Sequence, residues 1–441
     1  MPETDDNTLP RWLRAHGHQL ATLDPDAEDD RDLEPLLEIV GHARVVALGE
    51  SMHRSHEFLA LRNRLFRFLA RRAGFTALVL ESGFPEGFAL DAWIGAGGAG
   101  LRSILNDAVT YHFGKCQETL DQAAWMREQA ANGARSVRYY GMDVPDSAAS
   151  AAPAVRLATE VLERVDPSFA AAVRNRLLPR FGYLPADRSG LARAAPAIHA
   201  YLALPEAERN AITAGIAGLA QRIRAKRLDY AVIDAEGTEI ALHSAEVAVA
   251  ADAFLAAMAD GPTRTWSPAN IRDAAMAETV QWILEREPRV LVFAANGHVR
   301  KTAYLAPPFV TQPMSTMGEH LADRLGDDLL VIGTTFGGGT AWLHRPGPDD
   351  PEGHSTPFTE ELADADPASL DAALADAELG SFFVDLRSAP AEVAAALDAT
   401  SGRRNGPYIE PADVRRSFDA IVHVDRISPW HTWIDAHGHW E

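Results

Sequence analysis

The stretch VVALGESMH, Val45–His53, decides how the rest of the chain is interpreted. Its first four residues are apolar or small and typical of a buried strand, and the apolar run stops at Gly49. Glu50 and His53 follow within one turn of each other. In open α/β sheets, ligands bind where buried strands end and release polar side chains into the following loops. The stretch therefore predicts an α/β fold with a polar site directly after a buried strand.

Strand and helix patterns alternate along much of the remaining sequence. An amphipathic helix is expected over 56–72, where apolar residues recur at helical spacing. Further short apolar strands are expected at 77–81, 138–143, 290–295, 329–335, 382–385 and 421–425. Short apolar strands separated by helices predict a largely parallel central sheet that is flanked by helices.

The alternation is interrupted between 148 and 260. This stretch is rich in Ala, Leu and Arg, has helical periodicity, and contains no convincing strand. We interpret it as an inserted helical subdomain over the strand ends, forming a cleft wall or lid. The α/β catalytic core would then comprise 1–147 and 261–441.

Composition restricts the partners and the compartment. The chain has 441 residues, a formal net charge of −21 and one cysteine, Cys116. An acidic surface repels nucleic acid and anionic membranes, so neither is expected as a partner, whereas a small-molecule substrate is. The single cysteine excludes a disulfide within the chain, the N-terminus does not resemble a signal peptide, and no apolar run approaches the roughly 20 residues that span a bilayer. A cytoplasmic protein is expected, and its oligomeric state is left open.

Several polar residues stand where they could meet. Glu81, Asp143 and His298 each lie at or just after a predicted strand, as Glu50 and His53 do. The carboxyl ends of parallel strands share one edge of a sheet, so these groups are expected to converge. Taken singly, Asp143 is better explained as a cap or loop residue, and His298 as a hydrogen-bonded structural histidine. The set as a whole favours a catalytic site.

One arginine belongs to the same set. Arg62 falls at the margin of the apolar face of the helix over 56–72. An unpaired buried charge is unfavourable, so Arg62 needs a partner, and Glu50 or Glu81 is expected to supply it.

The segment ALGESMHRSHEFLALRNRL, 47–65, resembles the signature of the erythromycin esterase family, G-E-x-x-H-G-x-x-E-F followed by an arginine. Three further blocks are similar to that family: LVLES at 78–82, NIRDAAMAETVQWIL at 270–284 and VFAANGHVRK at 292–301. The resemblance implies an α/β core with a helical insertion that forms a deep cleft. It also implies hydrolysis of a cyclic ester, which for the best-known members lies in macrolide antibiotics.

The resemblance also assigns roles to residues. It implies that His53 is the base that activates water, with Glu50, Arg62, Glu81 and His298 as the other catalytic residues. Imidazole, with an ordinary pKa of about 6.5, can accept a proton from water near neutral pH. A carboxylate would orient the imidazole, and Arg62 or His298 would stabilise the oxyanion.

The chain departs from the family pattern at one place. Arg54 replaces the common glycine after the motif histidine, where it could change substrate choice or add an anion contact. We expect Arg54 to bind substrate together with Asp143 and Tyr111, the last being one of several aromatic residues that could line an apolar cleft.

Alternatives remain open on sequence alone. Glu50, His53, Glu81 and His298 would also suit a divalent ion, although a nearby arginine disfavours one, and metal-free hydrolysis without a cofactor is the favoured expectation. The same acid–base set could run a lyase, dehydratase or acyl-transfer reaction on a natural-product intermediate. A third possibility is a non-catalytic protein that binds a large, partly apolar ligand.

Overall fold

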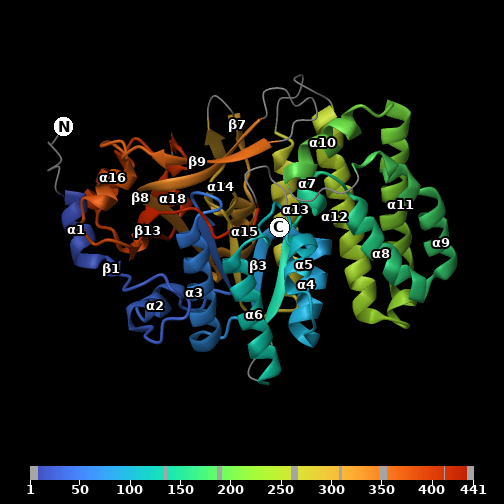
Figure 1. Ribbon diagram of the computed structural model, residues 1–441, viewed down its shortest axis with the longest axis horizontal. Helices are drawn as coiled ribbons and strands as arrows, with labels where there is room; N and C mark the ends of the chain where they lie inside the picture. The colour runs from blue at the N-terminus through green and yellow to red at the C-terminus, as the bar shows by residue number, and fades with distance from the viewer. Residues whose placement is uncertain are drawn as a thin grey trace.

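A central sheet of nine strands organises the fold (Figure 1). The computed structural model describes residues 8–133, 137–185, 191–259, 267–306, 310–346, 355–411 and 413–434. The strand order is β1-β10-β13-β8-β2-β5-β3-β4, with β9 paired to β8. From β13 to β4 every neighbouring pair is parallel, whereas β1, β10 and β9 pair antiparallel. The predicted largely parallel sheet is therefore confirmed.

The strand bounds follow the expected apolar runs closely. The sheet contains β1 (His18–Gln19), β2 (Val45–Glu50), β3 (Ala77–Gly83), β4 (Arg138–Asp143), β5 (Val290–Ala295), β8 (Leu329–Pro346), β9 (Ser355–Leu362), β10 (Phe382–Asp385) and β13 (Ala420–Ile427). Two small two-stranded sheets pair β6 (Tyr304–Ala306) with β7 (Val310–Met314), and β11 (Arg403–Asn405) with β12 (Tyr408–Glu410). The sequence did not predict β9 or the small sheets, and β8 extends beyond its apolar run because β9 pairs with that extension.

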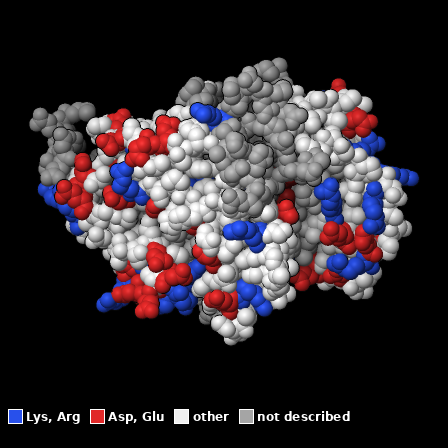
Figure 2. Space-filling model, viewed as in Figure 1, with Lys and Arg blue, Asp and Glu red and all other residues white. Residues whose placement is uncertain are grey.

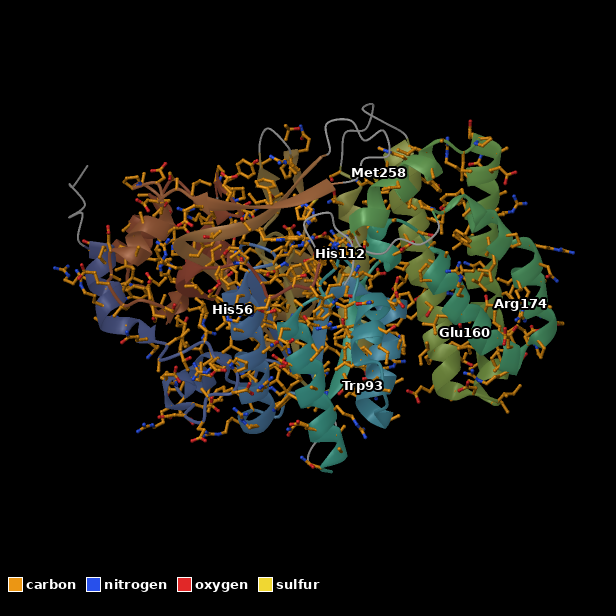
Figure 3. All side chains as sticks on the ribbon, viewed as in Figure 1. His56, Trp93, His112, Glu160, Arg174 and Met258 are labelled. Atoms are coloured by element: carbon orange, nitrogen blue, oxygen red, sulfur yellow. The ribbon has the colours of Figure 1, made fainter. Side chains whose placement is uncertain are left out.

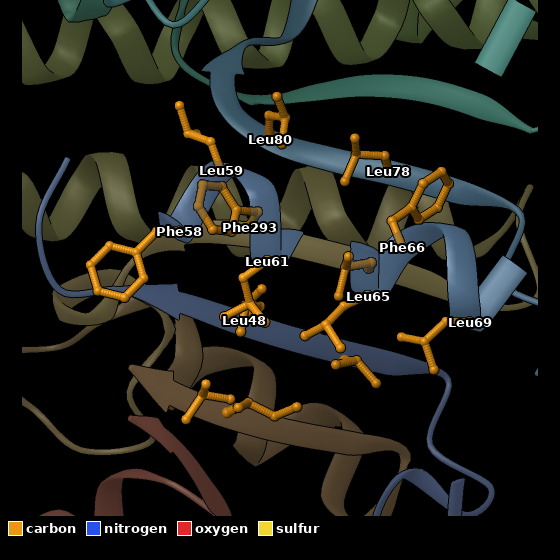
Figure 4. Packing of buried hydrophobic residues seen from close by; sticks show 14 of the residues in the cluster. Leu48, Phe58, Leu59, Leu61, Leu65, Phe66, Leu69, Leu78, Leu80 and Phe293 are labelled. Atoms are coloured by element: carbon orange, nitrogen blue, oxygen red, sulfur yellow. The ribbon is translucent and has the colours of Figure 1, made fainter. Parts of the chain in front are cut away.

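Helices cover both faces of the sheet. One face carries α2 (Leu36–Val40), α3 (His56–Arg72), α4 (Phe84–Ala96), α5 (Leu101–Ala108) and α6 (Gln117–Ala131). The other carries α1 (Thr8–His16), α13 (Ala269–Leu284), α15 (Met317–Leu325), α16 (Leu370–Ala375) and α17 (Ala391–Asp398). Side chains alternate along β2, so Val46 and Leu48 join the core beneath α3 while Val45 and Ala47 join the opposite core. Figure 4 shows Leu48 among the apolar side chains of the first core. A strand buried on both faces explains the continuous apolar run before Gly49.

A helical bundle follows β4. It consists of α7 (Pro145–Ala148), α8 (Ala152–Val165), α9 (Pro167–Arg176), α10 (Leu191–Leu202), α11 (Glu206–Ala231) and α12 (Ala235–Ala259). The longer helices stand side by side at one end of the molecule, beside the sheet (green to yellow in Figure 1). The bundle has its own apolar core, which Phe84 of α4 and Val144 also join. The division into a core and an inserted subdomain, and the role of that subdomain as a lid, stay predictions.

One helix of the bundle is unusually apolar. By length and composition alone, α12 is long and apolar enough to cross a membrane, which the sequence interpretation had not expected. It is the single such helix in the described part of the chain, and 56% of its most apolar window is buried inside the protein. Buried residues of α12, including Ala241, Ala245 and Leu255, instead identify it as a core helix of the bundle.

Gly49 allows a close approach between β2 and the segment after β5. A Cβ atom at Gly49 would lie 2.0 Å from Asn296 Oδ1. Asn296 is fully buried, donates through Nδ2 to the Thr334 carbonyl oxygen at 2.8 Å, and accepts from the Thr334 backbone N–H at 3.1 Å. Asn296 thus fastens the end of β5 to β8, and only glycine leaves room for it.

We expect Gly49→Ala to destabilise the protein by about 1–3 kcal/mol, because the added methyl group displaces the Asn296 amide from its two hydrogen bonds. Chemical denaturation would measure the change. Gly218→Ala is the control, since a Cβ there meets nothing within 4 Å on exposed α11 and should stabilise by about 0.4–1 kcal/mol. Equal effects of the two substitutions would contradict the proposed packing.

Candidate active site

The polar residues expected to converge lie at one edge of the sheet. Glu50, Glu81 and Asp143 end or nearly end β2, β3 and β4, and His298 follows β5 in α14 (Asn296–Val299). The order β2-β5-β3-β4 makes these strands neighbours, and all run parallel. The chain leaves β2 for α3 on one face and leaves β5 for α15 on the other. Such a change of direction is where open α/β sheets bind ligands.

Glu50 orients His53. The Nδ1 atom of His53 donates to Glu50 Oε2 at 2.7 Å, and the side chain of Glu50 is 3% exposed whereas that of His53 is 35% exposed. With Nδ1–H bound to a carboxylate, the lone pair of the imidazole lies on Nε2. Among the described residues, no side chain or backbone group forms a hydrogen bond with this Nε2. His53 is therefore positioned as a base that solvent or a ligand can reach.

Arg272 of α13 links two of the carboxylates. Its Nη2 donates to Glu81 Oε1 at 2.8 Å, and its Nε donates to Asp143 Oδ1 at 2.9 Å. The second oxygen of Glu81 accepts from the Ala295 backbone N–H at 2.9 Å. Burial alone would raise the pKa of Glu81, but attraction to His298 and Arg272 holds that pKa well below its usual range. The site thus contains a buried, ionised carboxylate paired with fixed cations.

His298 lies in the same network and is held between two carboxylates. Its Nδ1 donates to Asp273 Oδ1 at 2.9 Å, and its Nε2 lies 3.3 Å from Glu81 Oε1. Burial would lower the pKa of His298, but attraction to Asp273 and then Glu81 outweighs burial and raises the pKa to about 10. The two carboxylates therefore favour the positively charged form of His298. The two histidines of the site differ in exposure and in the charges around them.

Asp143 supports its neighbours instead of facing a ligand. It is fully buried, and its oxygens accept from Arg272, from the Tyr111 hydroxyl at 3.0 Å and from the Val144 backbone N–H at 2.7 Å. This placement gives no support to the expected contact between Asp143 and substrate. Burial raises the pKa of Tyr111 well above its usual range, so Tyr111 stays a phenol, and its half-buried ring lies under the Arg272 guanidinium.

Arg62 lies deeper than expected and has other partners. It is 1% exposed, and it donates from Nε to Asn63 Oδ1 at 2.9 Å and from Nη2 to Thr119 Oγ1 at 3.4 Å. Within the described residues no direct ion pair joins Arg62 to Glu50 or Glu81, although the charge of Glu50 acts on Arg62 from a greater distance. Arg272 already occupies Glu81, which is why that carboxylate is not available to Arg62.

Arg54 packs against aromatic rings beside the site. Its guanidinium carbon lies 5.7 Å from the ring centre of Phe113, 5.4 Å from that of Trp342 and 5.9 Å from that of Trp430. Burial lowers the pKa of Arg54 to about 10, an effect that the nearby charge of Glu50 partly offsets. Arg54 thus adds a largely buried positive charge close to the His53–Glu50 pair.

The sequence interpretation missed Arg272 and Asp273. Both residues lie near the start of α13 and contact His298. The Nη1 atom of Arg272 lies 3.3 Å from His298 Nε2, and Asp273 Oδ1 accepts from His298 Nδ1. The signal was present, because both residues lie in the block NIRDAAMAETVQWIL that contributed to the family resemblance.

Glu50, His53, Glu81 and His298, the ligands considered for a divalent ion, are not arranged around a common ion position. Arg272 contacts both Glu81 and His298, and a guanidinium in that position repels a dication. Within the described ranges, one group of three side chains is close enough to hold an ion. It lies outside this site and consists of His56, Glu118 and His431. The geometry therefore gives no support to the metal-dependent alternative at this site.

Comparison with known proteins identifies the family. The model of the erythromycin esterase family matches residues 70–427. This range is well over half of the chain. The chain belongs to the erythromycin esterase family. Membership indicates an ester hydrolase, and the family resemblance drawn from the motifs is confirmed.

Individual relatives extend the match to the His53 motif. Erythromycin esterase type II of Escherichia coli is 27% identical over 432 residues, spanning 95% of this chain and 97% of that protein, a span too long to omit Val45–Arg62. Erythromycin esterase type I of Escherichia coli is 24% identical over 345 residues, covering 76% of this chain and 81% of that protein.

Solved structures confirm the esterase-family fold. A protein from Bacillus cereus superposes with a TM-score of 0.78 at 24% identity, covering 97% of this chain and 99% of that one. A mutant of the erythromycin esterase EreC in its open conformation superposes with a TM-score of 0.76 at 21% identity, covering 92% and 96% of the two chains.

The erythromycin esterase pattern has glycine where this chain has Arg54, and the backbone explains that preference. Arg54 has a φ of 64°, in the left-handed region that glycine enters readily and other residues do not. Arg54 therefore occupies a backbone conformation that glycine would suit better. The packing of Arg54 on three aromatic rings compensates for this local strain.

We expect Arg54→Gly to be more stable than Arg54→Ala by about 1–2 kcal/mol, because alanine retains the left-handed strain and glycine removes it. Both variants lose the guanidinium, so their difference isolates the backbone contribution. Parallel urea denaturation of the two variants measures it, and an alanine variant at least as stable as the glycine variant would contradict the strain argument.

Proposed function

We propose that this esterase-family protein hydrolyses an ester or lactone with water activated by His53. The observation that carries the proposal is the contrast between the two histidines. His53 is 35% exposed and is oriented through Nδ1 by Glu50, whereas His298 is 14% exposed and lies between Asp273 and Glu81, which favour its positively charged form. An accessible base beside a fixed positive charge is the pair that ester hydrolysis needs.

In the proposed reaction, Nε2 of His53 removes a proton from water as the oxygen attacks the ester carbonyl carbon. Glu50 stabilises the imidazolium that forms. When the tetrahedral intermediate collapses, the C–O bond to the alcohol breaks and His53 returns the proton to the leaving oxygen. The products are a carboxylic acid and an alcohol, together containing the atoms of one ester and one water.

The negative charge that develops on the carbonyl oxygen needs a preorganised positive group. We assign this role to His298 and Arg272, which Asp273, Glu81 and Asp143 hold in place. Arg62, which the sequence offered for this role as the alternative to His298, is 1% exposed and bound to Asn63 and Thr119. We propose that Arg62 stabilises the core beneath the site and does not contact the substrate.

The substrate proposed is a large, partly apolar cyclic ester of the macrolide kind. The relatives named erythromycin esterases support this class, and so does the aromatic surface beside the proposed base. The ring of Phe113 lies 5.2 Å from that of His53 and 5.9 Å from that of Tyr111. Such a surface suits apolar atoms of a ligand, and Tyr111 and Arg54 are the proposed substrate contacts.

We further propose that the protein works in the cytoplasm on a small molecule, without nucleic acid, membrane or cofactor. Its net charge of −21 supports the exclusion of anionic partners. On the face drawn in Figure 2, basic side chains are scattered among acidic ones and form no broad positive surface.

Incubation of the protein with a panel of lactones in isotopically labelled water tests the reaction class. Hydrolysis predicts a product heavier by one water, with the label in its carboxylate. A product lighter by one water would instead indicate a dehydratase or lyase. Substrate that binds but is recovered unchanged would indicate a non-catalytic binding protein.

A further inference from the structure

A second polar cluster lies behind the His53 loop. It is formed by His56 at the start of α3, Glu118 in the first turn of α6, and His431. His431 belongs to the C-terminal strap, which we define as residues 428–434. Figure 3 labels His56 on α3. None of these residues has a role in the proposed hydrolysis.

The C-terminal strap lies between two other segments of the chain. Ser55 forms a β-bridge with Pro429, and Cys116 forms one with Thr432. The Trp430 backbone N–H donates to the Arg54 carbonyl oxygen at 2.9 Å, directly after His53. The strap thus fastens the loop that carries the proposed base.

Glu118 joins the two histidines of the cluster. Its Oε1 lies 2.7 Å from His56 Nδ1 and 3.0 Å from His431 Nδ1, and it also accepts from the His431 backbone N–H at 3.1 Å. Glu118 is 5% exposed, and its other oxygen, Oε2, is buried without a recorded hydrogen-bond partner. A buried carboxylate oxygen without a partner is unfavourable, and a cation beside it would remove that penalty.

We propose that His56, Glu118 and His431 form a binding site for a divalent transition-metal ion of the zinc kind. The three ligand atoms lie within 4.8 Å of one another. Two imidazoles and one carboxylate are a set that Zn²⁺ accepts, with water in the remaining position. The side chains of His56 and His431 are 35% and 64% exposed, so solvent reaches the fourth position.

Two of the three ligand separations are close to those of an occupied site, and the third, between the two histidine nitrogens, is at most 4.8 Å. Ligand atoms around a tetrahedral zinc at about 2.0–2.2 Å lie about 3.3 Å from one another. The observed 2.7 and 3.0 Å separations would therefore open by a few tenths of an ångström when an ion enters. The exposed ring of His431 can make that adjustment without disturbing the core.

The ion would join segments that are far apart in sequence. It would bind α3, α6 and the C-terminal strap together, next to the Ser55–Pro429 bridge. A bond that exists only in the folded protein stabilises the folded state, so the ion would hold the strap and support the His53 loop. The role is structural, and the hydrolytic steps at His53 do not require it.

Zinc titration of the full chain, first dialysed against a chelator, tests the site. Calorimetry should show saturable binding of one ion per chain, and zinc should raise the melting temperature. Loss of an outer-shell partner already weakens metal binding by about 10–100-fold, so His431→Ala, which removes a direct ligand, should weaken it by at least about 10-fold. The same variant should also abolish the rise in melting temperature.

Two controls separate this site from other histidines. The double variant His437→Ala/His439→Ala removes two histidines of the terminal sequence HTWIDAHGHWE, which lie outside the described residues, and it should bind zinc as the parent does. The His53→Ala variant should also bind zinc as the parent does. Loss of binding in either control, unchanged binding in His431→Ala, or absence of zinc binding by the parent would overturn the proposal.

Discussion

His53→Ala should lower kcat/KM for ester hydrolysis by about 10²–10⁴-fold, the usual contribution of a positioned general base. The fold should persist, because the His53 side chain is 35% exposed and its recorded hydrogen bond is the one to Glu50. Mass-detected hydrolysis of a reactive lactone measures the loss. Circular dichroism and ligand affinity, both expected to change little, show that the protein remains folded and able to bind.

His56→Ala provides a matched comparison for this prediction. His56 lies three residues further on, its side chain is also 35% exposed, and its Nδ1 is also 2.7 Å from a carboxylate, that of Glu118. It differs from His53 in its surroundings, because the charge of His53 acts on Glu81 of the candidate site whereas His56 is paired with Glu118. Its loss should therefore reduce turnover far less. Equal losses in both variants would mean that the loop had been disturbed, and full activity in His53→Ala would exclude the proposed base.

The sheet was predictable because its central strands are apolar on both faces. A run such as Val45–Leu48 is recognisable without any knowledge of its neighbours. The two residues of β1 and the polar stretch of β9 carry no such signal, since their pairing with β10 and β8 depends on residues far along the chain. Strands defined by pairing alone cannot be read from local sequence.

The site divides in a similar way. The contact between Glu50 and His53 was predictable because the two residues are separated by one turn. The partner of Glu81 was not, because Arg272 approaches from a helix 191 positions further along the chain. The packing of α13 against the sheet decides that Arg272, and not Arg62, reaches Glu81.

Asp273→Asn should lower kcat/KM by about 10²–10³-fold, the range seen when an oxyanion donor is lost. Asp273 is fully buried, and its Oδ2 accepts from the Met317 backbone N–H at 2.9 Å while Oδ1 binds His298. Asparagine can keep the bond from Met317, but its NH₂ group then faces His298 Nδ1. That nitrogen must now accept a hydrogen bond, which favours the neutral imidazole and removes the positive charge from the site.

The same substitution should change the pH dependence. Attraction to Asp273 and Glu81, against the opposing effect of burial, raises the pKa of His298 from its ordinary 6.5 to about 10. A raised pKa in the folded state contributes stability that is complete below pH 6.5 and is lost as the pH rises through about 10. Asp273→Asn should therefore be less stable than the parent at neutral pH and lose less stability between pH 6.5 and 10. The alkaline limb of its kcat/KM profile should also move to lower pH.

Asp371→Asn separates the effect of charge at His298 from the effect of altering any buried carboxyl group. Asp371 is as completely buried as Asp273 and lies in α16, where its Oδ2 accepts from the Arg404 backbone N–H. Burial raises its pKa to about 6, so replacement by a neutral amide is a mild change there. This control should keep its turnover and its alkaline limb, because no histidine depends on its charge. If Asp273→Asn kept the alkaline limb of the parent, His298 would not be the cation that stabilises the oxyanion, and Arg272 alone would have to supply that charge.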